Sequence, residues 1–195
     1  MKQKVLVIAS SSNKKGNSSF LASLFIAKAN PDLYQFSLVN LYDLNIEYFS
    51  NENRTSDIEQ NPNNQDARNL LDAIEDANKI VLAFPVWNLS VPAILKNFLD
   101  RAGVSGRAWS EQKKKKVANW KGKQFYLLLT MGSKWHQSLI PNLAVLHLYL
   151  VLKYYGAKVR VVKRAYNCGN GSTLVLADRK RLIRKMHRKS KRYWK

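Results

Sequence analysis

The chain has 195 residues, and its 33 Lys and Arg against 13 Asp and Glu give a formal net charge of +20. This length favours one domain, residues 1–195, that is large enough for a full core. No apolar run reaches the roughly 18 residues of a membrane span, and the one cysteine, Cys168, cannot form an internal disulfide. We therefore expect a cytoplasmic protein without a membrane span.

The positive charge is concentrated at the carboxyl end of the chain. Residues 179–195 hold 10 basic and no acidic residues, whereas residues 40–78 hold nine of the 13 acids. Such a tail is compatible with nucleic-acid binding. No nucleic-acid motif accompanies it, so the favoured interpretation is a solvated basic helix, with nucleic acid as the alternative partner.

Strand-like and helix-like patterns alternate along the chain. The expected strands cover residues 4–9, 34–41, 79–84, 124–130 and 158–166. The expected helices cover residues 17–29, 66–78, 92–101, 142–155 and 174–190. This alternation predicts βαβ units, and so an α/β three-layer sandwich around a parallel sheet. The polar residues 51–65 and the four lysines at 113–116 are expected in surface loops.

The expected helix at 142–155 is apolar on more than one face. A helix of this kind is buried either by its own sheet or by a partner subunit. An outer-layer helix normally keeps one polar face in solvent, so the pattern slightly favours a homodimer.

The loop after the first expected strand is rich in small polar residues and leads into a helix. Backbone N–H groups at a helix N-terminus, aided by hydroxyls, are suited to bind a phosphate. The candidate ligands are Ser10, Ser11, Gly16, Asn17, Ser18 and Ser19. The alternative is that Ser18 and Ser19 only cap the helix. The glycine patterns of dinucleotide-binding turns and P-loops are absent from the sequence.

Two further loops follow strands expected at the same edge of the sheet. Pro85 is expected to end the third strand, because it has no N–H to donate. The candidate residues of the second loop are Pro85, Val86, Trp87, Asn88 and Leu89. Those of the third loop are Thr130, Met131, Gly132 and Ser133. A phosphate at the first loop and a planar ring at the other two would together describe one ligand, FMN.

The run from Pro85 to Lys96 fits the pattern P-x-[YW]-N-x-x-x-P-x-x-L-K, and Asp100-Arg101-Ala102-Gly103 follows it. With these motifs, residues 2–166 resemble the flavodoxin-fold FMN reductases of the NAD(P)H:quinone oxidoreductase and FMN-dependent NADH-azoreductase family. Some members of that family were formerly labelled acyl-carrier-protein phosphodiesterases. The resemblance implies a five-stranded parallel sheet in the order 2-1-3-4-5, with FMN held by the three loops.

The resemblance also implies an activity. Two electrons would pass from NADH or NADPH through FMN to a quinone or an azo compound by a ping-pong mechanism. The alternatives are a flavodoxin-like electron-transfer or binding module, and a nucleic-acid-binding protein acting through its basic tail. Flavodoxins are usually acidic, which argues against the first. An acyl-carrier-protein hydrolase is disfavoured, because the sequence shows no paired carboxylates with metal ligands.

The sequence departs from the family pattern at two places. Its third loop reads Thr-Met-Gly-Ser where azoreductases often have Ser-Arg-Gly-Gly, and Trp87 replaces a frequent tyrosine. No residue is expected to act as a nucleophile or to bind a metal. His136 is a weak candidate to orient the acceptor, with a solvated histidine as the favoured interpretation. His147 is expected to be packed within its apolar helix.

Overall fold

The computed structural model describes residues 1–27, 29–50, 64–132, 143–166, 168, 183–186, 188 and 192–194. Seven strands occur among these residues: β1 (Gln3–Ala9), β2 (Tyr34–Asn40), β3 (Lys79–Pro85), β4 (Trp109–Gln112), β5 (Lys115–Ala118), β6 (Gln124–Thr130) and β7 (Lys158–Ala165). The helices are α1 (Asn17–Ile26), the short 3-10 helix η1 (Leu41–Asp43), α3 (Gln65–Asp76), α4 (Ala93–Val104) and α5 (Leu143–Tyr154). No helix in these ranges has the length and apolar character to span a bilayer.

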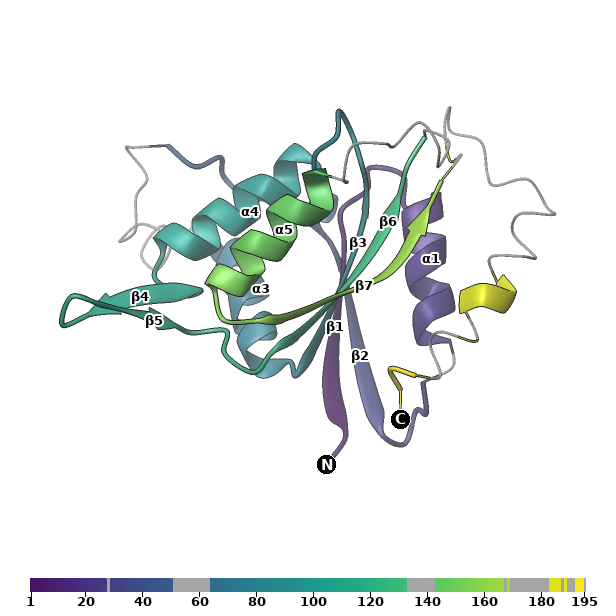
Figure 1. Cartoon of the computed structure of the whole chain (residues 1–195), viewed down its shortest axis with the longest axis horizontal. Coiled ribbons are helices and arrows are strands. Elements are labelled where there is room, and N and C mark those ends of the chain that lie inside the picture. Colours follow the sequence, from purple (N-terminus) through teal and green to yellow (C-terminus); the bar gives the residue numbers. More distant parts are fainter. Residues whose placement is uncertain are drawn as a thin grey trace.

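Five of the strands form one parallel sheet in the order β2-β1-β3-β6-β7. Counted within that sheet, this is the expected order 2-1-3-4-5. Helices α3, α4 and α5 cover one face, and α1 lies on the other (Figure 1). The central strands carry apolar side chains on both faces, so a separate hydrophobic cluster fills each side of the sheet. The predicted α/β three-layer architecture is confirmed.

The strand β3 continues one residue further than the sequence predicted. Pro85 is its last residue and pairs with Thr130 of β6. On the other side β1 has already ended, since its last residue Ala9 pairs with Ala83. Strand alternation directs the missing N–H of Pro85 toward this ended strand, while the Val86 N–H still donates to the Thr130 carbonyl at 2.8 Å. The proline therefore costs the sheet no bond to β6.

The prediction of a surface loop at the four lysines, residues 113–116, was wrong in part. Lys115 and Lys116 belong to β5, which pairs antiparallel with β4 as a projecting hairpin (Figure 1). Lys113 and Lys114 form its turn, with φ angles of 50° and 60°. Positive φ at both central residues defines the type I′ turn that best fits a twisted hairpin. Lysine is unusual at these two positions, so no turn could be predicted from the residues.

The basic tail is not simply solvated. Residues 183–186 and 188 are helical, and the rest of the expected helix at 174–190 lies outside the described residues. Met186 and Trp194 are buried in the cluster on the α1 side of the sheet. The Trp194 indole N–H donates to the Phe25 carbonyl at 2.7 Å. The interpretation of the tail as a solvated helix is therefore wrong at these anchoring residues.

Candidate functional site

The three predicted loops meet at the carboxyl edge of the sheet, after the adjacent strands β1, β3 and β6. Ser10 continues from β1 and donates its N–H to the Ala83 carbonyl of β3 at 2.9 Å. Thr130, the last residue of β6, accepts the Val86 N–H with its carbonyl. Its side chain shares a hydrogen bond of 2.9 Å with the Ser18 hydroxyl of α1. Thr130 therefore joins the first and second loops to the end of β6.

The first loop is a tight cradle that opens at the N-terminus of α1. The Gly16 N–H donates to the Asn13 carbonyl at 3.0 Å, and no side chain caps the helix. A Cβ built at Gly16 would lie 2.9 Å from the Asn13 carbonyl oxygen, so a side chain would force the turn open. The alternative role considered for Ser18, a helix cap, is not what its side chain performs, since its hydrogen-bond partner is Thr130.

Ser10 supplies the observation that tests whether an anion fits this cradle. Its hydroxyl is buried and makes no hydrogen bond within the described part of the chain. An unsatisfied buried hydroxyl costs free energy unless a ligand or water supplies the missing partner. The Ser11 hydroxyl differs from that of Ser10, because it already donates a hydrogen bond to the Asn13 carbonyl at 3.3 Å. A loop that begins with a buried, unpartnered hydroxyl and ends at an uncapped helix N-terminus is a donor set that fits an anion such as a phosphate monoester.

The second loop is a type I′ turn bounded by Trp87 and Ser90. These two residues exchange backbone hydrogen bonds at 3.1 and 2.9 Å. The central residues Asn88 and Leu89 have φ angles of 48° and 62°. Asparagine tolerates this conformation, but leucine does so at a cost of about 1 to 3 kcal/mol. Trp87 and Leu89 remain 47% and 48% exposed, so the strained turn presents apolar surface at the carboxyl edge.

The third loop is described only at its start. Met131 is buried, donates its N–H to the Ala165 carbonyl at 2.7 Å, and accepts the Cys168 N–H at 2.8 Å. Gly132 is exposed. Ser133 and His136 lie outside the described residues, so their predicted roles stay predictions. The bond to Cys168 fixes the start of this loop against the end of β7.

Two tertiary contacts, one of them at the first loop, were missed by the sequence reasoning. The Asn40 side-chain amide donates to the Ser11 carbonyl at 3.0 Å, which fastens the first loop to the end of β2. On α4, the guanidinium of Arg101 donates to the Glu47 and Tyr48 carbonyls, while Asn97 bonds Glu47 and Phe49. Arg101 belongs to the recognised Asp-Arg-Ala-Gly motif, yet that motif gave no signal that it holds the 47–49 segment.

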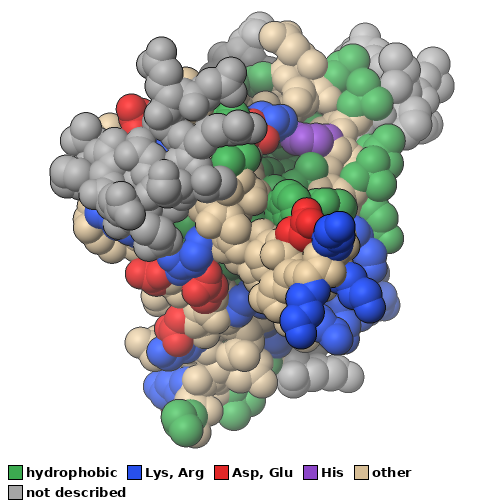
Figure 2. Space-filling model, turned by 90° about the vertical axis from the view of Figure 1, so that its left-hand side faces the viewer, with side chains coloured by type: hydrophobic (Ala, Val, Ile, Leu, Met, Phe, Trp, Pro, Cys, Tyr) green, Lys and Arg blue, Asp and Glu red, His purple; other side chains and the backbone are tan. Residues whose placement is uncertain are grey.

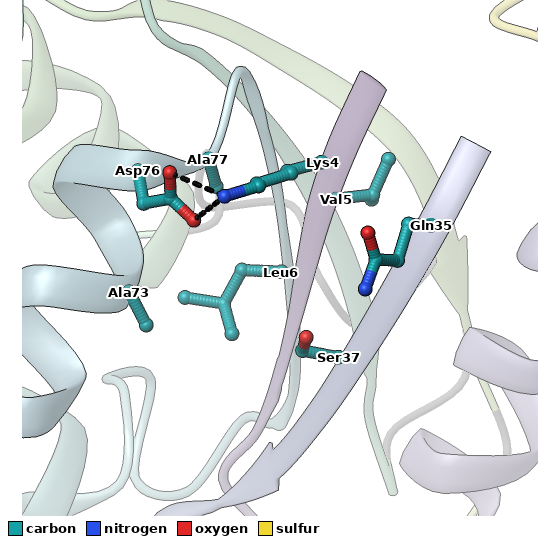
Figure 3. A pocket seen from close by; sticks show the side chains of 8 residues that line it. All are labelled: Lys4, Val5, Leu6, Gln35, Ser37, Ala73, Asp76 and Ala77. Atoms are coloured by element: carbon teal, nitrogen blue, oxygen red, sulfur yellow. Dashed lines mark hydrogen bonds and ion pairs between the residues drawn. The ribbon is translucent and has the colours of Figure 1, made fainter. Parts of the chain in front are cut away.

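A small pocket at the opposite edge of the sheet does not compete with this site. It has a volume of about 140 Å³ and lies between β1, β2 and α3 (Figure 3). Its charged residues, Lys4 and Asp76, form an ion pair of 2.7 Å with each other across the pocket. Because these charges are mutually neutralised, the pocket offers no obvious charged anchor to a ligand.

Comparison with known proteins agrees with this geometry. The model of a family described as having a flavodoxin-like fold matches residues 3–188. An FMN-dependent NADH:quinone oxidoreductase from Clostridium beijerinckii is 28% identical over 167 residues, covering 80% of this chain and 81% of the relative. A second enzyme of that name, numbered 2, from Mesoplasma florum is 36% identical over 109 residues, covering 53% of each chain.

Solved structures show the same fold at lower identity. The FMN-dependent NADH-azoreductase from Bacillus anthracis, in complex with FMN, superposes with a TM-score of 0.74 at 15% identity, covering 99% of this chain and 100% of the other. A quinone reductase, described as putative, from Klebsiella pneumoniae gives a TM-score of 0.76 at 17% identity, covering 100% and 86%. Similarity at this level establishes the common fold.

Proposed function

This chain belongs to the flavodoxin-like fold family, and we propose that within it the chain is an FMN-dependent NAD(P)H oxidoreductase. Its acceptors would be quinones, with azo compounds as a second class. The names of the relatives support the activity and both acceptor classes. The structural observation that carries the proposal is the buried, unpartnered Ser10 hydroxyl at the start of the loop that leads from β1 to the uncapped N-terminus of α1.

The phosphate of FMN would be held at the first loop. The candidate residues lie in the loop before α1 or in its uncapped first turn: Ser10, Ser11, Gly16, Asn17, Ser18 and Ser19. Backbone N–H groups and the positive end of the helix dipole favour an anion there. In this arrangement the Ser10 hydroxyl gains the partner that it lacks. Ser18 would contribute its backbone, because its hydroxyl is committed to Thr130.

The flavin ring would lie against the second and third loops. The type I′ turn projects Trp87 and Leu89 outward, where they can contact a planar ring, while Pro85 and Val86 hold the turn to β6. When bound, FMN supplies the two-electron chemistry between NAD(P)H and the acceptor. The protein's part is to fix the ring and shield one face, leaving the other open to donor and acceptor in turn. That alternation is the basis for the ping-pong order.

We also propose that the active form is a homodimer. One face of α5 packs on the sheet, while the other exposes the large apolar residues Leu143, Leu146, Tyr149, Leu150 and Tyr154. Figure 2, which views the molecule from the left-hand side of Figure 1, shows hydrophobic side chains beside a cluster of lysine and arginine side chains. An apolar patch of this extent favours contact with a second subunit. A cytoplasmic location suits a reaction that consumes NAD(P)H.

An anaerobic absorbance titration tests the proposed activity. The purified chain with FMN should show flavin bands near ~450 nm that bleach on adding NADH or NADPH and return with a quinone. Bands that resist both nicotinamides would favour an electron carrier. Failure to bind FMN would overturn the proposal.

A matched pair of serine variants locates the phosphate subsite. Ser10→Ala should weaken FMN binding by about tenfold, the effect of one hydrogen bond to a charged group. Ser23→Ala is the matched control, because it removes an exposed hydroxyl of α1 that donates to the Ser19 carbonyl. This variant should leave FMN affinity unchanged. Equal affinities for both variants would contradict the assigned cradle.

A further inference from the structure

The described part of the basic tail is held against the body of the protein, and its described cations are exposed. Met186 and Trp194 are only 0% and 6% exposed. The Lys79 ammonium donates to the Tyr193 carbonyl at 3.1 Å and lies 5.1 Å from the Trp194 ring centre. Between and beside these anchors, Arg184, Lys185, Arg188 and Arg192 are exposed. The two buried anchors therefore fix the positions of these four cations relative to the body of the protein.

Two cations of β7 extend the same surface. Arg160 pairs in register with Tyr126 of β6, so both side chains lie on the α1 side of the sheet. The Tyr126 ring lies 5.3 Å from the ring of Tyr193 in the tail. Lys158 stands two residues before Arg160 and so faces the same way. We call Lys158, Arg160, Arg184, Lys185, Arg188 and Arg192 the basic face.

Among the described residues, the acids form no ion pair with the basic face. The ion pairs found in the described ranges join Lys4 to Asp76, Lys14 to Asp43, Lys96 to Asp100, Arg101 to Glu47, and Arg107 to Asp72 and Glu75. Most of these acids belong to α3, α4 and the η1 region, and none of the pairs involves the basic face. Helix α1, the neighbour of the tail in Figure 1, carries no charged residue. In the part of the chain that the structure describes, the cations of the basic face therefore have no acidic partner.

We propose that the basic face is a binding surface for the phosphate backbone of double-helical nucleic acid. A row of fixed cations without base-reading groups suits sequence-independent contact with phosphates. Single strands are usually held by exposed aromatic rings, but here Trp194 is buried and Tyr193 packs on Tyr126. A membrane-surface helix would direct apolar residues outward, whereas Met186 points into the core.

Binding to a labelled duplex of arbitrary sequence, followed by fluorescence anisotropy at several salt concentrations, tests this surface. Six phosphate contacts predict a slope of log affinity against log salt of about −5. The quadruple variant R184Q/K185Q/R188Q/R192Q should reduce the slope to about −2. Its matched control is K113Q/K114Q/K115Q/K121Q, which removes the same charge at and near the hairpin on the other side of the molecule. The control should keep a slope close to that of the unmodified chain.

Three results would overturn the proposal. Equal losses in the two variants would mean that only total charge matters. No duplex binding by the unmodified chain at about 0.1 M salt would exclude the surface. Tail-dependent binding to phosphatidylserine vesicles, without duplex binding, would assign it to a membrane. FMN binding is measured for every variant, so a folding defect or a failure of the proposed enzymatic function is recognised separately.

Discussion

Ser18 and Thr130 lie 112 residues apart in the chain, yet their hydroxyl oxygens are 2.9 Å apart in a buried hydrogen bond. The bond connects the first turn of α1 to the end of β6. Thr130 also accepts the Val86 N–H with its carbonyl, so one residue fixes the start of the second loop as well. The geometry of the proposed FMN site thus depends on a contact that no local sequence pattern encodes.

A double-mutant cycle measures this contact. Ser18→Ala and Thr130→Val should each lower the free energy of unfolding by about 1 to 3 kcal/mol, because each leaves a buried hydroxyl without its partner. The double variant should cost less than the sum, since it leaves no unpaired hydroxyl. Urea unfolding supplies the values. Additive costs would mean that the two hydroxyls do not interact.

In the type I′ turn at Asn88 and Leu89, one substitution should raise the stability of the fold and lower its affinity for FMN. Leu89→Gly should relieve the positive-φ strain and raise the free energy of unfolding by about 1 kcal/mol, while weakening contact with the flavin ring. Lys114→Gly is the matched control, since Lys114 has φ 60° in the hairpin turn. It should stabilise similarly and leave FMN affinity unchanged, as measured by unfolding and flavin titration. Loss of FMN affinity in both variants would contradict this role for Leu89.

Alanine substitutions of Trp194 and Trp87 should have opposite effects on stability and on FMN binding. Trp194→Ala removes a buried ring that contacts Phe25, Tyr34 and Phe36, and should cost about 3 to 5 kcal/mol of unfolding free energy. Trp87 is 47% exposed, so Trp87→Ala should cost much less stability but weaken FMN binding. Thermal unfolding and flavin titration of both variants provide the comparison. An unaffected Tm for Trp194→Ala would show that the tail does not dock.

The lowered pKa of His147 predicts that the stability of the fold depends on pH. Burial, and then the charge of Lys96, lower the pKa of His147, and Asp100 partly opposes them. The folded state therefore binds the proton less tightly than the unfolded chain. Stability from this group is complete above its ordinary pKa of about 6.5 and is lost as the pH falls toward the lower folded value. The Tm difference between the native chain and His147→Gln should change over this range and not above it.

The sequence predicted most of the fold because its strongest signals were local. The apolar runs of β3 and β6 identified buried strands, and Gly156, now seen at φ 89°, marked the end of α5. The hairpin was missed because Lys113 and Lys114 adopt a turn that usually selects Asn and Gly. Trp194 was missed for a different reason. Its burial depends on Phe25, 169 residues away, and nothing in the neighbouring basic residues indicates that contact.

The strand ends from which the three loops leave were predicted correctly, but the roles of individual side chains were not all accessible. Parallel topology alone brings the ends of β1, β3 and β6 to one edge, so the candidate residues could be gathered without a structure. Whether a hydroxyl points into that edge or into the core depends on packing. Ser10 and Ser18 show the difference, since one is unpartnered and the other is bonded to Thr130.

The sheet has two unequal outer strands. Neither β2 nor β7 pairs with a further strand in the ranges that the structure describes. Strand β7 carries Lys158, Arg160, Lys163 and Arg164, and like charges repel a second copy that approaches edge to edge. Strand β2 has no charged residue, and its Leu38 is 72% exposed. If the protein aggregates through its sheet under stress, β2 is the edge at which intermolecular pairing begins, and a lysine in place of Leu38 is the substitution that would protect it.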